Sequence, residues 1–318
     1  MKRMLAAILS GLLCLTMLCA CGQTAMPAET EISVQAVTVT DDMGTVCSFS
    51  ETPARVAALT GSFAETWLLA GGELCAAVQD AWDDFELGLP ETVHNLGSYQ
   101  NISLELLFES EPDLVIASAN TKNHVELKDT LEKAGVAVLY FDVNGFGDYL
   151  RMLRACTLIT GRDDLYEKNG TAVERQVQAV QDAAAEKLKT QEAPDVLFLR
   201  AAASAVRAKG SDGTVLGEML AALGCVNIAD GSSLLEDLSI EVIIEKDPEF
   251  IFLVQQGDDV EAMERMLSET LTGNPAWSGL TAVKEGRMYF MDKHLFHFKP
   301  NARWGEAYEQ LFALLYGN

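Results

Sequence analysis

The chain has 318 residues, of which 49% are hydrophobic and 22% are charged, with 24 glycines and only 8 prolines. This composition can bury a core and excludes collagen-like, low-complexity and fully disordered chains, and the length suggests about two domains of ~150 residues each. The 47 acidic and 23 basic side chains give a formal charge of −24. Such a surface repels phosphate backbones and anionic lipid headgroups, so we expect neither nucleic-acid binding nor attachment through basic patches.

The first 20 residues have the pattern of an export signal. Lys2 and Arg3 precede an apolar run over residues 4–17, which suits a secretion signal and is too short for a stable membrane span. The run ends in Leu-Cys-Ala-Cys-Gly at positions 18–22, which resembles a bacterial lipobox. We therefore expect residues 1–20 to be a lipoprotein signal peptide and Cys21 to carry a lipid. The alternative is ordinary secretion with cleavage at a small residue.

The segment after this signal is polar and shows no strand or helix pattern, so we expect residues 21–40 to form a tether. A lipid on Cys21 holds the exported protein on the outer face of the cytoplasmic membrane, at the cell surface or on the periplasmic side. Four further cysteines lie far apart without a C-x-x-C motif, at positions 47, 75, 156 and 225. They permit three disulfide pairings or none.

Short apolar runs alternate with helical patterns along the rest of the chain, which favours an α/β fold. In the first half we predict strands at residues 55–59, 74–79, 114–117 and 136–141, and helices at 63–70, 104–109 and 125–133. In the second half we predict strands at 195–199, 250–254 and 288–291, and helices at 216–223, 240–245, 260–267 and 302–315. The two groups define a Rossmann-like N-terminal lobe at residues 41–146 and a Rossmann-like C-terminal lobe at residues 191–318.

The two halves contain an internal repeat. Residues 102–117 align without gaps on residues 238–253, and the matching pairs are Ser103 and Ser239, Glu105 and Glu241, Glu109 and Glu245, and Pro112 and Pro248. Each copy predicts a short helix that begins after a serine, ends before a proline and leads into a buried strand. Any two helix–turn–strand units share part of this pattern, but the ungapped agreement favours duplicated lobes.

One long helix is predicted between the lobes, within a helical region at 147–190. Residues 163–190 carry apolar side chains at three- and four-residue spacings, and about 28 helical residues span roughly 42 Å. Such a helix is a rigid connection whose weakest point is Gly170. Two lobes joined in this way leave a cleft between them, and ligands of open α/β sheets bind beyond the C-terminal strand ends.

Histidines supply one possible chemistry for this cleft. The sequence contains no P-loop, no H-E-x-x-H, no G-x-S-x-G and no paired C-x-x-C motif. His124, His294 and His297 each follow a predicted strand, and three histidines with an acid would suit a transition-metal ion. No spacing in the sequence enforces that arrangement.

Residues 292–311 are the segment richest in functional groups. They combine histidine, lysine, asparagine, arginine and tryptophan around Phe296 and Phe298, directly after a predicted strand. Cations, donors and aromatic faces together suit a bulky anionic or aromatic ligand. The alternative is that the aromatic side chains seal the lobe and the cations are merely exposed.

Four segments resemble the iron-siderophore/cobalamin class (class III) of substrate-binding proteins of ABC importers. The most specific is residues 96–118, where Gly-Ser-Tyr-Gln-Asn-Ile-Ser-Leu-Glu is followed by Pro-Asp-Leu-Val-Ile, and the others are residues 134–142, 160–162 and 219–230. With the C-terminal segment, the resemblance covers nearly all of the mature chain. It implies two α/β lobes, a rigid interlobe helix, and a cleft that closes only slightly around an organic metal complex.

The resemblance also implies delivery of that complex to a membrane permease. In this class one surface glutamate on each lobe docks to arginines of the permease dimer, and Glu105 and Glu218 match these positions. The implied partners are the permease dimer with its ATPase subunits, and we expect the binding protein itself to be a monomer.

Ligand-contacting residues vary too much within the class to be transferred, so we nominate them by loop position alone. The candidates in the N-terminal lobe are Thr60, Trp82, Tyr99 and Asn120. The candidates in the C-terminal lobe are Arg200, Arg207, His294, His297 and Lys299.

The sequence therefore predicts a lipid-anchored binding protein, with no catalytic site and no resident cofactor, for an iron–siderophore complex, haem or cobalamin. Anionic siderophores call for converging Arg or Lys side chains, whereas haem calls for a tyrosine or histidine at the iron. Direct binding of a zinc- or manganese-type ion through His124, His294 and His297 is the alternative. An enzyme or adhesin ranks last, because no nucleophile–base pair is visible.

Overall fold

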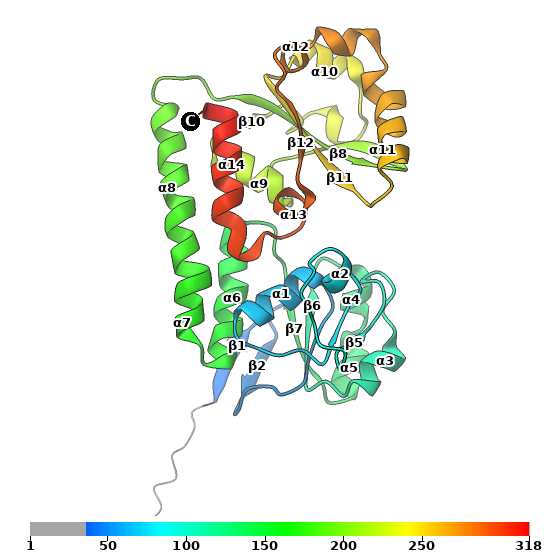
Figure 1. Ribbon diagram of the computed structural model, residues 1–318, viewed down its shortest axis with the longest axis vertical. Coiled ribbons are helices and arrows are strands. Elements are labelled where there is room, and N and C mark those ends of the chain that lie inside the picture. The colour runs from blue at the N-terminus through cyan, green and yellow to red at the C-terminus, as the bar shows by residue number, and fades with distance from the viewer. Residues whose placement is uncertain (1–35, 318) are drawn as a thin grey trace, which may run out of the picture. The chain divides into compact units, whose positions relative to one another are not determined.

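The computed structural model describes residues 36–317, which form two mainly parallel sheets and a β-hairpin (Figure 1). The N-terminal sheet has the order β5-β4-β3-β6-β7, with every neighbouring pair parallel. The C-terminal sheet has the order β10-β8-β11-β12, also parallel, and β9 pairs antiparallel with β8. The strands are β1 (Val37–Thr40), β2 (Val46–Phe49), β3 (Val56–Ala58), β4 (Ala76–Ala77), β5 (His94–Asn95), β6 (Leu114–Ser118), β7 (Ala137–Phe141), β8 (Asp195–Ala202), β9 (Ala205–Lys209), β10 (Val226–Asn227), β11 (Phe250–Gln256) and β12 (Met288–Met291).

This architecture confirms the predicted α/β class with two lobes. It also differs from the sequence prediction at the N-terminal side, where β1 occupies residues 37–40 of the segment expected to be a tether. These residues are ordered because β1 pairs along its length with β2. The Asp41 carboxylate that follows β1 accepts hydrogen bonds from the Met43, Thr45 and Tyr140 N–H groups, which fixes the hairpin against β7.

Helices connect the strands of both lobes. In the N-terminal lobe they are α1 (Gly61–Leu69), α2 (Asp80–Asp83), α3 (Leu104–Glu109), α4 (Lys122–Glu126), α5 (Lys128–Lys133) and α6 (Phe146–Thr160). In the C-terminal lobe they are α9 (Val215–Ala222), η2 (Ser233–Leu235), α10 (Ile240–Lys246), α11 (Val260–Leu267), η3 (Ser268–Thr272), η4 (Pro275–Gly279), α12 (Thr281–Lys284), α13 (Lys293–Phe296), η5 (Asn301–Arg303) and α14 (Trp304–Tyr316).

Side-chain caps explain several helix starts. The Thr60, Ser103 and Ser239 hydroxyls each accept a hydrogen bond from the N–H group three residues later, which satisfies a donor that the first turn leaves free. The single helix predicted at 125–133 is wrong, since α4 and α5 meet at Leu127. The Leu127 N–H group bonds back to the His124 carbonyl in a tight turn, and this ends α4.

The chain stays helical from residue 163 to residue 187, where one helix was predicted. α7 (Asp163–Tyr166) continues through a π-helical turn, η1 (Glu167–Thr171), into α8 (Ala172–Lys187). The π turn is tied to the N-terminal lobe, because the Asn169 side-chain amide donates to the Leu69 carbonyl at 2.8 Å. At the other end, Lys187 donates to the Tyr316 carbonyl at 3.1 Å, and α14 lies beside α8 (Figure 1).

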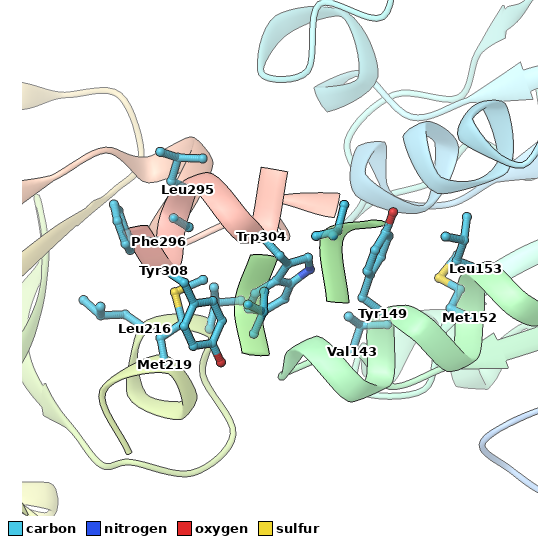
Figure 2. Close-up of a cluster of buried hydrophobic side chains, with 14 of the residues drawn as sticks. Val143, Tyr149, Met152, Leu153, Leu216, Met219, Leu295, Phe296, Trp304 and Tyr308 are labelled. Carbon is cyan, nitrogen blue, oxygen red and sulfur yellow. The ribbon is translucent and has the colours of Figure 1, made fainter. Parts of the chain in front are cut away.

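A continuous hydrophobic core joins the two sheets (Figure 2). It runs from Leu114 of β6 to Phe252 of β11, and fully buried Trp304 lies near its middle. The Trp304 ring is 5.8 Å from the Phe146 ring and 6.3 Å from the Tyr308 ring, centroid to centroid. Because the lobes share this core, moving one against the other requires repacking of buried aromatic side chains.

The expected signal peptide, residues 1–20, and Cys21 lie outside the described residues. Among residues 36–317, no helix is both long enough and apolar enough to cross a membrane. Cys47, Cys75, Cys156 and Cys225 are free thiols in this structure.

Candidate ligand-binding site

A cavity of about 180 Å³ opens between the N-terminal sheet and the segment that follows β12. Its N-terminal wall comes from the segments after β3, β4, β5 and β6, so it lies beyond the C-terminal ends of parallel strands, where open α/β sheets bind ligands. The opposite wall is residues 297–299. The lining residues are Thr60, Ser62, Phe63, Asp80, Phe85, Tyr99, Ser118, Thr121, His297, Phe298 and Lys299.

Aromatic rings shape much of this cavity. Phe85 from the N-terminal lobe and Phe298 from the C-terminal segment face each other with ring centroids 5.5 Å apart. Phe63 packs edge-on against Phe141 at 6.3 Å. Tyr99 is 38% exposed. The cavity therefore presents aromatic surface to a ligand from both lobes.

His124 has a structural role, because it joins the segment that contains Tyr99 to the end of β6. Its ring is fully buried, Nε2 donates to the Tyr99 carbonyl at 2.9 Å, and Nδ1 accepts from the Ser118 N–H group at 3.2 Å. Burial lowers the pKa of His124, so the ring stays neutral. Both nitrogens are occupied, and neither is free to bind a metal ion.

The geometry therefore does not support the alternative of a metal-ion site on His124, His294 and His297. Among the residues that the structure describes, no group of three or more His, Cys, Asp or Glu side chains is arranged to hold a metal ion. His294 packs its ring against Phe298 at 5.7 Å. His297 lines the cavity with an Nδ1 atom that is buried and unpaired within residues 36–317.

Cations collect on the C-terminal wall. Arg200 on β8 lies directly opposite Arg207 on β9, and both line a smaller pocket of about 100 Å³ together with Lys209. Burial lowers the pKa of Arg200, and it lowers the pKa of Lys209, which the charges of Arg200 and Arg207 depress further. These three side chains form a basic strip on the β8–β9 hairpin.

The basic strip extends to the cavity through His297 and Lys299. Burial, followed by the charges of Arg200 and Lys299, lowers the pKa of His297 to about 4. Burial also lowers the pKa of Lys299, and Asp142 only partly offsets this. Across residues 36–317, none of Arg200, Arg207, Lys209 and Lys299 forms an ion pair. In a chain this acidic, four neighbouring cations without a paired carboxylate are unusual.

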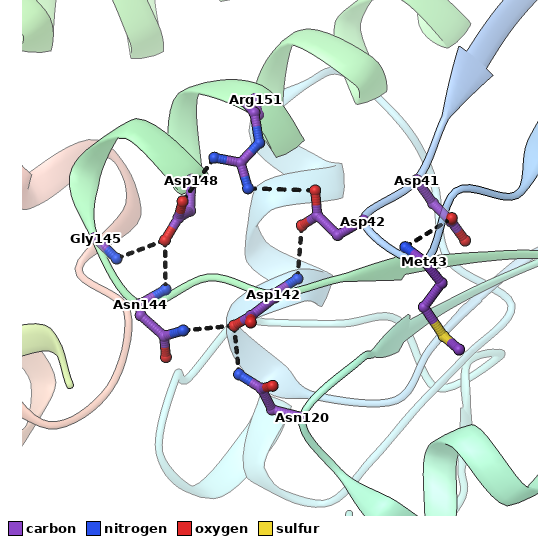
Figure 3. Close-up of polar contacts among 9 residues, drawn as sticks. All are labelled: Asp41, Asp42, Met43, Asn120, Asp142, Asn144, Gly145, Asp148 and Arg151. Carbon is purple, nitrogen blue, oxygen red and sulfur yellow. Dashed lines mark hydrogen bonds and ion pairs between the residues drawn. The ribbon is translucent and has the colours of Figure 1, made fainter. Parts of the chain in front are cut away.

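Five nominated ligand residues do not line the 180 Å³ cavity: Arg200 and Arg207 line the smaller pocket, and Trp82, Asn120 and His294 line neither. Trp82 packs on a small cluster of buried side chains that includes Ala58 and Val93. Asn120 is exposed and donates to the Asp142 carboxylate, which also accepts from the Asn144 side chain at 2.5 Å (Figure 3). Asn120 thus ties the loop after β6 to the loop after β7 at the rim of the site.

The same polar network anchors the loop after β7 to the first hairpin. The Asp142 N–H group donates to the Asp42 carboxylate at 2.7 Å, and Arg151 bridges Asp42 and Asp148 at 3.2 and 2.6 Å (Figure 3). The Asp148 carboxylate in turn accepts from the Asn144 and Gly145 N–H groups at the start of α6. These bonds hold the rim loop, and with it Asp142, in one position.

Several residues that line the two pockets were not predicted from the sequence. Asp80 directly follows the predicted strand 74–79, and this position at the end of a strand could have identified it as a candidate ligand residue. Phe298 lies in the C-terminal segment that was singled out, but was not nominated. Lys209 ends β9, a strand that the sequence reading did not predict because its alternating Ala, Val, Arg, Ala, Lys pattern is short and weakly hydrophobic.

The two predicted docking glutamates have different surroundings. Glu105 is exposed in the first turn of α3, beside Leu104 and Phe108, which are 37% and 38% exposed. Glu218 in α9 is half-buried and accepts a hydrogen bond from the Gly213 N–H group at 3.1 Å. Glu218 is thus less exposed than Glu105 and holds the loop before α9.

In the internal repeat, the residue of the C-terminal lobe that is equivalent to Glu105 is Glu241 rather than Glu218. Glu241 is exposed in the first turn of α10, where Ser239 donates to its carboxylate at 2.8 Å. Ile244, 37% exposed, repeats the position of Phe108. Each lobe therefore carries an exposed glutamate one turn before an exposed apolar side chain, and the alignment of residues 102–117 on 238–253 was the signal for it.

Comparisons with known proteins agree with this geometry. Residues 56–295 match the periplasmic binding protein family, whereas no curated protein sequence matches the chain. Similar solved structures include a periplasmic haem-binding protein of Pseudomonas aeruginosa, with 22% identity and a TM-score of 0.68 over 83% of this chain and 93% of that chain. The catecholate-siderophore binding protein of Vibrio cholerae has 17% identity and a TM-score of 0.70, over 89% and 100% of the two chains.

The vitamin B12 binding protein of Vibrio cholerae is similar as well, with 18% identity and a TM-score of 0.65 over 83% of this chain and 97% of that chain. At these identities the likeness shows a common fold. The matched family and these structures are binding proteins rather than enzymes, and the family implies a location outside the cytoplasm. Together with the two sheets and the cavity between them, the match over residues 56–295 shows that the chain belongs to the periplasmic binding protein family.

Proposed function

We propose that this protein is the substrate-binding lipoprotein of an ABC importer and captures an anionic iron complex, a ferric siderophore or haem, for delivery to the permease. The observation that carries the proposal is a set of four cations that form no ion pair within residues 36–317: Lys299 in the cavity, and Arg200, Arg207 and Lys209 in the smaller pocket. Cobalamin, the third expected ligand, is less well matched because the edge of its ring carries mostly neutral amides.

The electrostatics of the wall favour an anion. Burial lowers the pKa values of Arg200, Lys209 and Lys299, and the charge of Arg200 lowers those of Lys209 and Lys299 further. Anionic groups of a ligand would supply the missing counter-charge through charge-assisted hydrogen bonds. Three of the five buried polar side-chain atoms without a partner in residues 36–317 belong to this site: Asp80 Oδ1, Arg200 Nε and His297 Nδ1. Such a concentration is expected where a ligand completes the hydrogen bonding.

The size of the cavity supports a ligand that extends over both pockets. Sites for drug-sized ligands enclose about 300–1,000 Å³, which exceeds the 180 Å³ next to Tyr99 and the 100 Å³ next to Arg207. The two pockets are neighbours, since Arg200 lines the smaller one and its charge lowers the pKa of His297, which lines the larger one. We infer that one ligand stacks on the aromatic side chains and reaches the basic strip.

Delivery would use the exposed glutamates of the two lobes. Glu105 and Glu241 are equivalent in the internal repeat and carry no cationic partner among the ion pairs of the described residues, so both are free to meet arginines of a permease dimer. Rim charges of this kind set the rate and orientation of encounter. The lipid on Cys21, predicted from the lipobox-like sequence, would keep the protein next to that permease.

A binding screen tests the proposal. The purified mature chain would be titrated with haemin, a ferric tricatecholate, a ferric trihydroxamate, ferric citrate and cyanocobalamin, with tryptophan fluorescence and visible absorption as readouts. We expect saturable binding of an anionic iron complex with an affinity that falls as salt rises. Binding of cyanocobalamin alone, or of none of the five complexes, would contradict the proposal.

A further inference from the structure

Asp80 is a carboxylate in the ligand cavity that the rest of the protein leaves incompletely bonded. It follows β4 as the first residue of α2 and lines the cavity with Thr60 and Tyr99. Its Oδ1 atom is buried and has no hydrogen-bond partner in the described part of the chain. A buried acceptor without a donor costs about 1–3 kcal/mol, and more when it is charged.

The nearby cations do not satisfy Asp80. Lys293 pairs with Asp84 and Asp258, both at 2.8 Å, and not with Asp80 within residues 36–317. His297 and Lys299 face the cavity from the C-terminal segment, yet neither forms an ion pair with Asp80 within the described residues. Burial, followed by the charge of Asp84, raises the pKa of Asp80 to about 6, although the Gly61 and Ala81 N–H groups oppose this shift.

A structural role accounts for only part of this carboxylate, because the Gly61 N–H group at the start of α1 favours its charge but Oδ1 has no partner within residues 36–317. Gln79, not Asp80, is the N-cap of α2, and no side chain caps that helix. Asp83 on the same helix differs from Asp80. Its side chain is exposed, and its carboxylate accepts a hydrogen bond from the Gln79 side chain at 2.9 Å. A neutral residue at position 80 would avoid the cost of a desolvated charge. Groups kept at such a cost are concentrated in functional sites.

We propose that Asp80 accepts a hydrogen bond from a donor group of the ligand, so that the ligand presents a hydroxyl, amide or ammonium group to the N-terminal wall and its anionic groups to the basic strip. The inference rests on the proposed function and narrows it. Ferric siderophores with amide or amine backbones carry both kinds of group. Haem carries carboxylates and hydrocarbon at its edge and offers no such donor at neutral pH.

Proton linkage tests this role directly. A donor that bonds to the Asp80 carboxylate lowers its pKa, so binding near pH 6 releases protons, whereas an anionic or apolar group placed beside it raises the pKa and causes uptake. Calorimetric titrations at pH 6 in two buffers with different ionisation enthalpies give the number of protons exchanged. The probes are the ferric tricatecholate and, in parallel, haemin.

The wild type is compared with Asp80→Asn, so that protons exchanged by the probe itself cancel. We expect the wild type to release up to about 0.5 proton more per site than Asp80→Asn with the tricatecholate. We also expect Asp80→Ala, which has no acceptor, to bind it about tenfold more weakly or worse. Asp83→Asn removes a charge from the same helix and should match the wild type in both respects.

Equal proton exchange in wild type and Asp80→Asn, or a net uptake in the wild type, would overturn the inference while leaving the proposed function intact. If one substitution prevents folding, the other still gives a result, because Asn and Ala both remove the titrating group. If neither probe nor any other complex of the screen binds, the proposed function fails and the inference fails with it.

Discussion

The Asn301 side-chain amide donates to the Ser62 carbonyl oxygen at 2.9 Å and so joins the C-terminal segment to the first helix of the N-terminal lobe. Asn301 is 1% exposed, and its Oδ1 atom accepts from the Thr66 hydroxyl at 3.2 Å. Its backbone has a φ of +51°, in the left-handed region that asparagine tolerates better than most residues. This contact fixes residues 297–299 against the loop that contains Thr60, and thereby sets the width of the cavity.

Substitution of Asn301 tests this contact. Asn301→Ala removes the hydrogen bonds and leaves the buried Ser62 carbonyl and Thr66 hydroxyl with fewer partners, so it should reduce the free energy of unfolding by about 2–3 kcal/mol. Asn301→Gly loses the same bonds but accepts the positive φ, and should be about 1 kcal/mol less destabilising than Ala. Urea denaturation measures both. A loss below about 0.5 kcal/mol for Asn301→Ala would show that the contact does not hold the segment.

His124 is expected to stabilise the fold without binding a metal ion. His124→Ala leaves the Ser118 N–H group and the Tyr99 carbonyl without their buried partner, which should cost about 2 kcal/mol or more. Zn²⁺ or Mn²⁺ added to the wild type should leave its melting temperature unchanged. Saturable Zn²⁺ binding to the wild type that disappears in His124→Ala would restore the metal-ion hypothesis.

Asp80→Asn should make the ligand-free protein more stable at pH 7.5. Because the folded-state pKa of Asp80 is raised from 3.8 to about 6, its contribution to stability is fully present below the unfolded pKa and is lost as the pH rises through the folded value. Removing the charge should recover up to about 2 kcal/mol above pH 6 and little below pH 4. Thermal melts of both proteins from pH 4 to pH 8 measure the difference. A difference that does not grow with pH would contradict the raised pKa.

Uptake, measured separately from ligand binding, tests the docking glutamates. Glu105→Ala combined with Glu241→Ala should leave ligand affinity unchanged but slow import about tenfold or more, because the exposed carboxylates act at the permease and not in the cavity. The control is Glu105→Ala combined with Glu174→Ala, which replaces an exposed acid on α8. It removes the same amount of charge and should import ligand faster than the Glu105→Ala, Glu241→Ala double variant. Import at the wild-type rate by the Glu105→Ala, Glu241→Ala double variant would refute the docking assignment. A larger loss of import in Glu218→Ala than in Glu241→Ala would refute it as well.

The parts of the fold that the sequence predicted are those with strong local signals. The helices at 104–109 and 260–267 and the strand at 288–291 have the predicted bounds. The two helices follow the capping residues Ser103 and Asp259, and their signals are local in the sequence. The missed strands have weak patterns of their own and depend on pairing with another strand. β5 has two residues held by β4, and β9 forms only because β8 is beside it.

The site was harder to predict because it forms from both lobes. Thr60, His297 and Lys299 follow predicted strands and, like Tyr99, line the cavity, whereas Trp82 packs into a small cluster of buried side chains. Asp80 lies in a cavity whose lining includes Phe85 from one lobe and Phe298 from the other, and these two rings are in contact. No local pattern in the sequence contains that contact.

The central claim, that unpaired cations of the C-terminal wall bind an anionic iron complex, is tested most directly by the dissociation constant of an Arg200→Gln, Lys299→Gln double variant. The control is Arg265→Gln, an exposed cation on α11, and the probe is the anionic complex that binds the wild type in the screen. Loss of two charge-assisted contacts should weaken binding at least about 100-fold in the double variant and leave the control unchanged. Equal dissociation constants for the double variant and the wild type would contradict the account.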